Sequence, residues 1–149
     1  MNNNTLTERQ IDCIGTCNSL LRGELSAVET YEKAIEKFAH DEEVATLRRI
    51  KDEHQTSVLE LRENIRQMGG EPDDDSGAWG SFANTVQGAA NLLGDDSAVA
   101  ALKQGEKHGL KEYEDAIEES STMPECRSLI ETQWLPRVKS HIRALDALD

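Results

Sequence analysis

Two glutamates and two histidines stand where four amphipathic segments should carry apolar side chains. Glu24 falls within the apolar stripe of the first segment, and His54 takes an apolar position in the second. Glu106 and His141 do the same in the third and fourth segments. A buried carboxylate is costly unless it is paired or bound to a metal. The four residues can therefore hold a divalent metal, with iron, manganese and zinc all suited, or form a dry Glu–His hydrogen-bond network.

Apolar residues spaced by three and four positions predict the helices that carry these side chains. We expect helices from about Thr7 to His40, from Asp41 to Met68, from Ser97 to Ser121, and from Pro124 onward. The short connection after the first helix requires an antiparallel hairpin, and the last two helices form a second one. Pro136 lies inside the fourth helix and predicts a kink or an early break there.

The two hairpins look like copies of one another. The segments from Leu20 to Glu36 and from Ala101 to Glu118 share Leu-x-x-Gly-Glu, then six residues, then Tyr-Glu-x-Ala-Ile-Glu. In each hairpin the Glu and the His lie at similar distances from the turn, within about one helical turn in height. Tyr31 and Tyr113 follow Glu24 and Glu106 by two helical turns. Each tyrosine can therefore donate a hydrogen bond to a carboxylate, or hold a metal ligand in place without binding the metal itself.

The middle of the chain predicts a long crossover. Gly69 to Ser81 is rich in glycine, proline and acidic residues, which indicates a non-helical connection. A short, weaker helix is expected from about Phe82 to Leu93. Trp79 and Phe82 can plug the end of the bundle or mark a self-association surface. A homo-oligomer is therefore one expectation for partners.

The composition supports an all-α, single-domain protein. Aromatic residues make up only 4% of the 149 residues, and no stretch alternates as a half-buried strand does. We expect one four-helix domain over residues 1–149. The net charge of −13 repels nucleic acid and anionic membranes, so neither is an expected partner.

Location follows from what the sequence lacks. The first ten residues show no secretory pattern, and no run reaches the roughly 18 apolar residues of a membrane span. The odd cysteine count indicates a reducing compartment, so we expect a cytoplasmic protein. Cys13 and Cys17 share a helix face, but no His or further Cys joins them at zinc-site spacing. We interpret the cysteines, including Cys126, as small core residues rather than a redox or metal site.

The sequence resembles the ferritin-like superfamily over nearly its whole length, and more narrowly a bacterial family of four-helix bundles of unknown function. The matching elements are Glu24-x6-Tyr31, His54 with Met68-Gly69-Gly70-Glu71-Pro72, Glu106-x6-Tyr113, and His141. The resemblance implies a ferritin-like bundle. Its better-known members carry Glu-x-x-His on the second and fourth helices and bind two irons.

This chain departs from that pattern at two positions. Lys51 stands three residues before His54 and Val138 three before His141, so both bridging carboxylates are absent. A second cation would lack its charge balance, and a single-metal site or none is the better expectation. Lys51 could instead neutralise a core glutamate.

Three functions follow. The first is a metal-binding protein linked to oxidative or metal stress, with Glu24, His54, Glu106 and His141 as ligands and the tyrosines and Lys51 around them. The second is a metal-free structural or interaction protein with a vestigial site. A di-iron oxidoreductase is the least favoured, so we do not expect an enzyme.

Overall fold

The computed structural model describes residues 5–38, 41–76 and 95–148, and every regular element in these ranges is helical. The first hairpin consists of α1 (Glu8–Lys37) and α2 (Asp41–Gln67). The second begins with α4 (Asp95–Glu118) and returns as one continuous helical segment. That segment comprises α5 (Pro124–Leu129), η2 (Ile130–Trp134) and α6 (Leu135–Asp146). The predicted all-α bundle of two antiparallel hairpins is confirmed.

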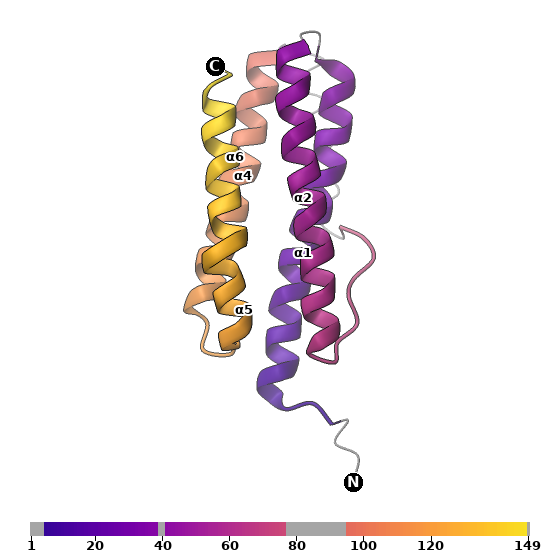
Figure 1. The fold of residues 1–149 in the computed structure, drawn as a ribbon, viewed down its shortest axis with the longest axis vertical. Coiled ribbons are helices and arrows are strands. Elements are labelled where there is room, and N and C mark those ends of the chain that lie inside the picture. The colour runs from indigo at the N-terminus through magenta and orange to yellow at the C-terminus, as the bar shows by residue number, and fades with distance from the viewer. Residues whose placement is uncertain (1–4, 39–40, 77–94, 149) are drawn as a thin grey trace.

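The positions of α2 and α4 agree with the long crossover expected between the hairpins. The chain leaves α2 at one end of the bundle, and α4 begins at the opposite end, as Figure 1 shows. As a result α1 and α6 run one way and α2 and α4 the other. The short helix expected from Phe82 to Leu93, together with Trp79, lies outside the described residues.

Local interactions fix where the first two helices begin and end. The Thr7 hydroxyl accepts from the Gln10 amide N–H, and the Gln10 side chain accepts from the Thr7 N–H, which caps α1. Past the end of α2, Gly69 has a φ of +87°, a conformation that favours glycine. The N–H groups of Gly69 and Gly70 bond back to the carbonyls of Arg66 and Ile65, and this pattern ends the helix cleanly.

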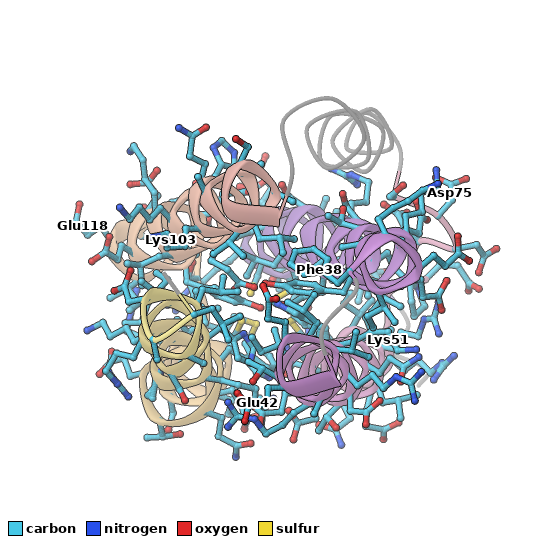
Figure 2. All side chains as sticks on the ribbon, turned by 90° about the horizontal axis from the view of Figure 1, so that it is seen from above. Phe38, Glu42, Lys51, Asp75, Lys103 and Glu118 are labelled. Atoms are coloured by element: carbon cyan, nitrogen blue, oxygen red, sulfur yellow. The ribbon has the colours of Figure 1, made fainter. Side chains whose placement is uncertain are left out.

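A polar layer divides the core into two apolar clusters. One cluster holds residues near the start of α1, the end of α2 and the α4–α5 turn, and it includes Trp134. The other holds residues near the end of α1, including Phe38, and the C-terminal Leu145. The buried polar residues Glu24, His54, Glu106 and His141 fall between the clusters on their four helices. Seen along the bundle in Figure 2, the charged side chains otherwise surround the outside.

Of the kink or early break expected at Pro136, the break does not occur. The chain stays helical through Pro136, and the irregularity is the π-helical turn η2 just before it. Pro136 has no N–H to donate and its ring crowds the carbonyl four residues earlier. The wider turn relieves this, and the Leu135 N–H bonds to the Ile130 carbonyl five residues back.

The π turn also keeps one face of this helix directed inward. Cys126, Ile130, Trp134 and Val138 are all buried, and each follows the previous one by four residues. In an ideal α-helix every such step drifts by about 40° around the axis. Three steps would turn Val138 about 120° away from the direction of Cys126. A turn that holds more residues offsets part of this drift.

No helix among the described residues is long and apolar enough to cross a membrane.

A pair of leucines on α2 tests the assignment of the core. Leu61 is fully buried, whereas Leu59 is 65% exposed. We expect Leu61→Ala to lower the free energy of unfolding by about 2–5 kcal/mol, because it leaves a cavity. Leu59→Ala should change it by less than about 0.5 kcal/mol. Urea denaturation followed by circular dichroism measures both, and equal effects would contradict the assigned inward face of α2.

Candidate metal centre

The structure brings together all four residues singled out by their position in the apolar stripes. Glu24 on α1, His54 on α2, Glu106 on α4 and His141 on α6 are each 5% exposed or less. The centroids of the two imidazole rings lie 4.5 Å apart. One side chain from each long helix thus meets at the middle of the bundle.

His54 joins the two glutamates. Its Nδ1 lies 2.8 Å from Oε2 of Glu24, and its Nε2 lies 2.8 Å from Oε2 of Glu106. Glu24 and Glu106 come from different hairpins, so this imidazole links the two halves of the bundle through their duplicated carboxylates.

His141 makes a second pair of carboxylate contacts, one of them with a residue that the sequence did not single out. Its Nδ1 lies 3.3 Å from Oε1 of Glu106, and its Nε2 lies 2.9 Å from Oε1 of Glu53. Glu53 contacts the histidine of the neighbouring α6 rather than His54 beside it on α2. The signal was that its direction, about 100° from His54, faces another helix of the bundle.

The two tyrosines donate to the carboxylates, in a crossed arrangement. The Tyr31 hydroxyl donates to Oε2 of Glu106 at 2.6 Å, and the Tyr113 hydroxyl donates to Oε1 of Glu24 at 3.2 Å. Each tyrosine therefore binds the glutamate of the other hairpin. Long helical side chains lean toward the N-terminus of their helix, which brings each hydroxyl back to the level of the carboxylates.

The two positions that depart from the ferritin-like pattern lie away from this network. Lys51 is half exposed at the edge of the bundle (Figure 2), in a shallow groove with Glu32, Glu36 and Arg48. Its ammonium makes no hydrogen bond or ion pair with Glu24 or Glu106 among the interactions of the described residues. Val138 is buried and packs in the apolar cluster around Trp134.

The positive charge in the centre comes from His54 instead. Burial disfavours its charged form, but the negative charges of Glu106 and Glu24 outweigh burial and raise the pKa of His54 well above its ordinary value. Burial would also raise the pKa of Glu106, yet the charge of His54 and the hydrogen bond from His141 lower it well below the usual range. Burial, followed by the charge of Glu106, raises the pKa of Tyr31, so it stays a donor.

The network is complete as it stands. Every buried side-chain nitrogen and oxygen atom of the described residues has a hydrogen-bond partner. A metal ion would therefore have to replace protons in this centre rather than fill unmet bonds.

Three of the side chains form a compact donor set. His54, Glu106 and His141 each offer one atom, and these three atoms lie within 4.8 Å of one another. The pairing of the ring nitrogens shows which atoms face Glu106: Nε2 of His54 and Nδ1 of His141. The opposite nitrogens face Glu24 and Glu53.

A small cavity of about 50 Å³ reaches the centre between α1 and α4. Small residues line part of it, including Gly23, Ala27, Gly105 and Gly109, and Glu24, His54 and Glu106 line its inner end. A Cβ atom added at Gly109 would meet no other atom within 4 Å. Gly109 thus leaves space in the cavity that the carboxylates line.

Comparisons with known proteins agree with this architecture. The family described as "Domain of unknown function (DUF2383)" matches residues 12–119. A similar solved structure is titled "Crystal structure of ferritin like, diiron-carboxylate proteins from Bacillus anthracis str. Ames". It superposes with a TM-score of 0.78 at 20% identity, covering 96% of this chain and 99% of the other. At this identity the likeness establishes the ferritin-like fold alone. No curated protein matches the chain.

The charge of His54 makes stability depend on pH in the metal-free protein. The pKa of His54 is higher in the folded state than its ordinary 6.5, so its stabilising effect is complete below about pH 6.5. This effect is lost as the pH rises through the folded-state pKa, by at most about 1.4 kcal/mol per pH unit. Glu106 acts oppositely, losing its contribution as the pH falls below its ordinary 4.5.

Thermal unfolding in chelator from pH 6 to 9 measures this effect. The loss of stability on raising the pH should be smaller in His54→Gln than in the unmutated protein. The full loss of stability on raising the pH should persist in His108→Gln, because His108 is exposed on α4 and pairs with Glu112 rather than with the buried glutamates. An unchanged slope in His54→Gln would contradict a charged His54.

Proposed function

We propose that this chain, which belongs to the DUF2383 family and has a ferritin-like fold, binds one divalent metal ion through His54, Glu106 and His141. The observation that carries the proposal is the placement of three donor atoms, from three helices, within 4.8 Å in a buried core. Two imidazoles and one carboxylate suit iron, manganese or zinc and leave coordination positions open.

The hydrogen bonds around these residues support this choice of ligands. If Nε2 of His54 and Nδ1 of His141 bind the metal, the remaining ring N–H groups donate to Glu24 and Glu53 at 2.8 and 2.9 Å. A carboxylate behind a metal-binding histidine fixes its tautomer and orientation. Glu24, expected from the sequence to be a ligand, is thus assigned a supporting position, and Glu53 joins it.

The donor set fits one metal rather than two. In the ferritin-like pattern the second ion depends on carboxylates at the positions of Lys51 and Val138. Here one is a half-exposed ammonium and the other an apolar core residue. The chain provides no replacement at those positions, so we derive no di-iron chemistry for it. A bound iron would supply a one-electron redox centre with open positions beside the cavity between α1 and α4.

A link to metal or oxidative stress stays a prediction from the sequence.

A metal-free bundle is the second candidate, and one observation favours it. Every buried polar side-chain atom of the described residues is already satisfied, with protonated His54 balancing the glutamates. The two candidates differ in protons, because a metal can take the place at Nε2 of His54 only if that nitrogen gives up its hydrogen.

Metal titration of protein purified without a polyhistidine tag distinguishes them. We expect one Fe(II), Mn(II) or Zn(II) per chain, with proton release that shows as a buffer-dependent heat in calorimetry. His54→Ala and His141→Ala should each weaken metal binding by at least about tenfold, since mutation of a residue that only supports a metal ligand already lowers the affinity by that much. His108→Ala is the matched control. Equal, negligible binding by all four proteins would establish the metal-free candidate.

The cavity predicts how the metal enters. Gly109→Leu should fill the space between α1 and α4 and slow uptake several-fold, without removing a ligand. Gly15→Leu places the same side chain at an exposed position of α1 that also has open space around it, and it should leave the rate unchanged. Stopped-flow mixing with a metal indicator measures both rates. Equal rates in the two variants would mean that metal enters elsewhere.

A further inference from the structure

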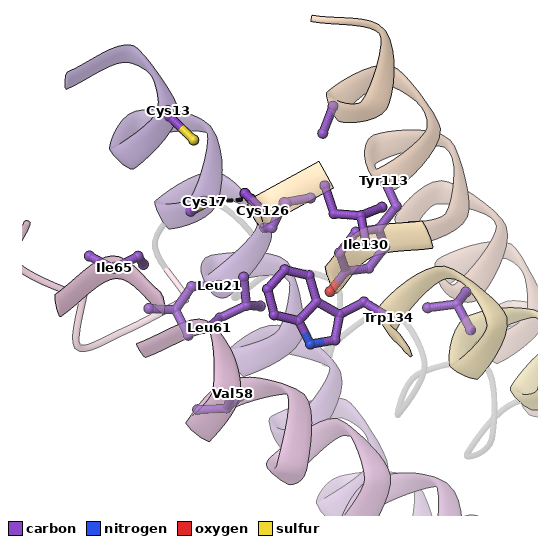
Figure 3. Packing of buried hydrophobic residues seen from close by; sticks show 13 residues of the cluster. Cys13, Cys17, Leu21, Val58, Leu61, Ile65, Tyr113, Cys126, Ile130 and Trp134 are labelled. Atoms are coloured by element: carbon purple, nitrogen blue, oxygen red, sulfur yellow. Dashed lines mark hydrogen bonds between the residues drawn. The ribbon is translucent and has the colours of Figure 1, made fainter. Parts of the chain in front are cut away.

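The three cysteines of the chain meet in the core, away from the carboxylate centre. Cys13 and Cys17 lie one turn apart on α1, and Cys126 faces them from α5, as Figure 3 shows. All three are at most 1% exposed and carry free thiols. Their sulfur atoms lie within 4.8 Å of one another, and those of Cys17 and Cys126 are 3.1 Å apart. The sequence interpretation treated them as ordinary core residues because Cys126 is distant in the chain.

The surroundings of the sulfurs combine apolar walls with two N–H donors. Leu21, Ile65 and Ile130 belong to the same buried cluster. The Met123 amide N–H lies 3.4 Å from Sγ of Cys13, and the side-chain amide of Asn64 donates to Sγ of Cys17 at 3.6 Å. N–H groups that donate to sulfur are typical of the surroundings of metal-bound thiolates, because they offset the negative charge of the thiolate.

The contact between Cys17 and Cys126 shifts the pKa values of these two thiols in opposite directions. The hydrogen bond from Cys17 lowers the pKa of Cys126, and the same hydrogen bond, together with burial, raises the pKa of Cys17. Burial raises the pKa of Cys13 as well. Three buried sulfur atoms this close together cannot all be thiolates unless a cation lies among them.

The kind of cation follows from the donors. Within the described part of the chain the cluster is made of sulfur alone, without a His, Asp or Glu. Thiolates select soft ions such as Cu(I) and Zn(II). Zinc normally takes a fourth ligand, and this buried cluster offers only three donor atoms among the described residues. Three sulfurs about 2.3 Å from a central ion lie roughly 4.0 Å apart. Opening the 3.1 Å contact between Cys17 and Cys126 would bring the cluster to that size.

We propose that Cys13, Cys17 and Cys126 form a second metal site, for one Cu(I) ion held by sulfur alone. Each thiol that binds the ion releases its proton to solvent, and no electron is transferred. On α1 this site lies seven residues before Glu24, about 10 Å along the helix from the carboxylate centre. It therefore requires neither histidine of that centre.

Competition with a chromogenic Cu(I) chelator tests the site under anaerobic conditions, on protein first shown to contain three reduced thiols. We expect one Cu(I) per chain. Cys17→Ala and Cys126→Ala should each weaken binding by at least about tenfold. Loss of a residue that only supports a metal ligand already has an effect of that size, and these two cysteines are the proposed ligands. His54→Ala/His141→Ala should keep the Cu(I) affinity of the unmutated protein. That double variant separates this proposal from the proposed function, because it loses the other metal only.

X-ray absorption at the copper edge keeps the test valid even if an alanine variant does not fold. In the unmutated protein it should show three sulfur neighbours and no nitrogen or oxygen. Nitrogen or oxygen ligands, or wild-type Cu(I) affinity in folded Cys17→Ala, would overturn the proposal.

Discussion

The burial of two glutamates in one core is the constraint on which the rest of this structure depends. Glu24 and Glu106 arise from the duplicated hairpin, and neither can stay charged in an apolar bundle without a partner. His54 lies between them and bonds to both. The two apolar clusters pack above and below this layer, so their separation follows from the need to keep four polar side chains at one height.

The duplication supplies symmetric donors, but the histidines use them unequally. Tyr31 and Tyr113 bind the glutamates in a crossed, two-fold-like manner. His54 contacts both duplicated glutamates, whereas His141 contacts Glu106 and the unduplicated Glu53. Glu106 therefore receives both imidazoles and Glu24 only one. The metal proposed above is placed beside Glu106 for this reason, because the equivalent place beside Glu24 lacks a second imidazole.

The sequence predicted what periodicity and spacing determine. Each stripe position has a fixed direction on its helix, so Glu24, His54, Glu106 and His141 could be placed at one height from their distances to the turns. Contacts between helices distant in the chain depend on how the bundle closes. This is why the sequence missed Glu53, which faces α6, and Cys126, which joins two cysteines of α1. The π turn was equally hidden, although three consecutive steps of four residues before Val138 were its signal.

The same turn gives the fourth helix two kinds of chemistry. It keeps Cys126 and His141 directed toward one core, although they lie at opposite ends of a face that would otherwise drift around the axis. Sulfur donors are thereby placed in one layer and imidazole with carboxylate in another. Soft thiolates and the harder nitrogen–oxygen set prefer different ions, so the two proposed sites would discriminate between metals by donor type. The two donor sets must also lie far enough apart not to share one ion, and the two turns of α1 between Cys17 and Glu24 provide that distance.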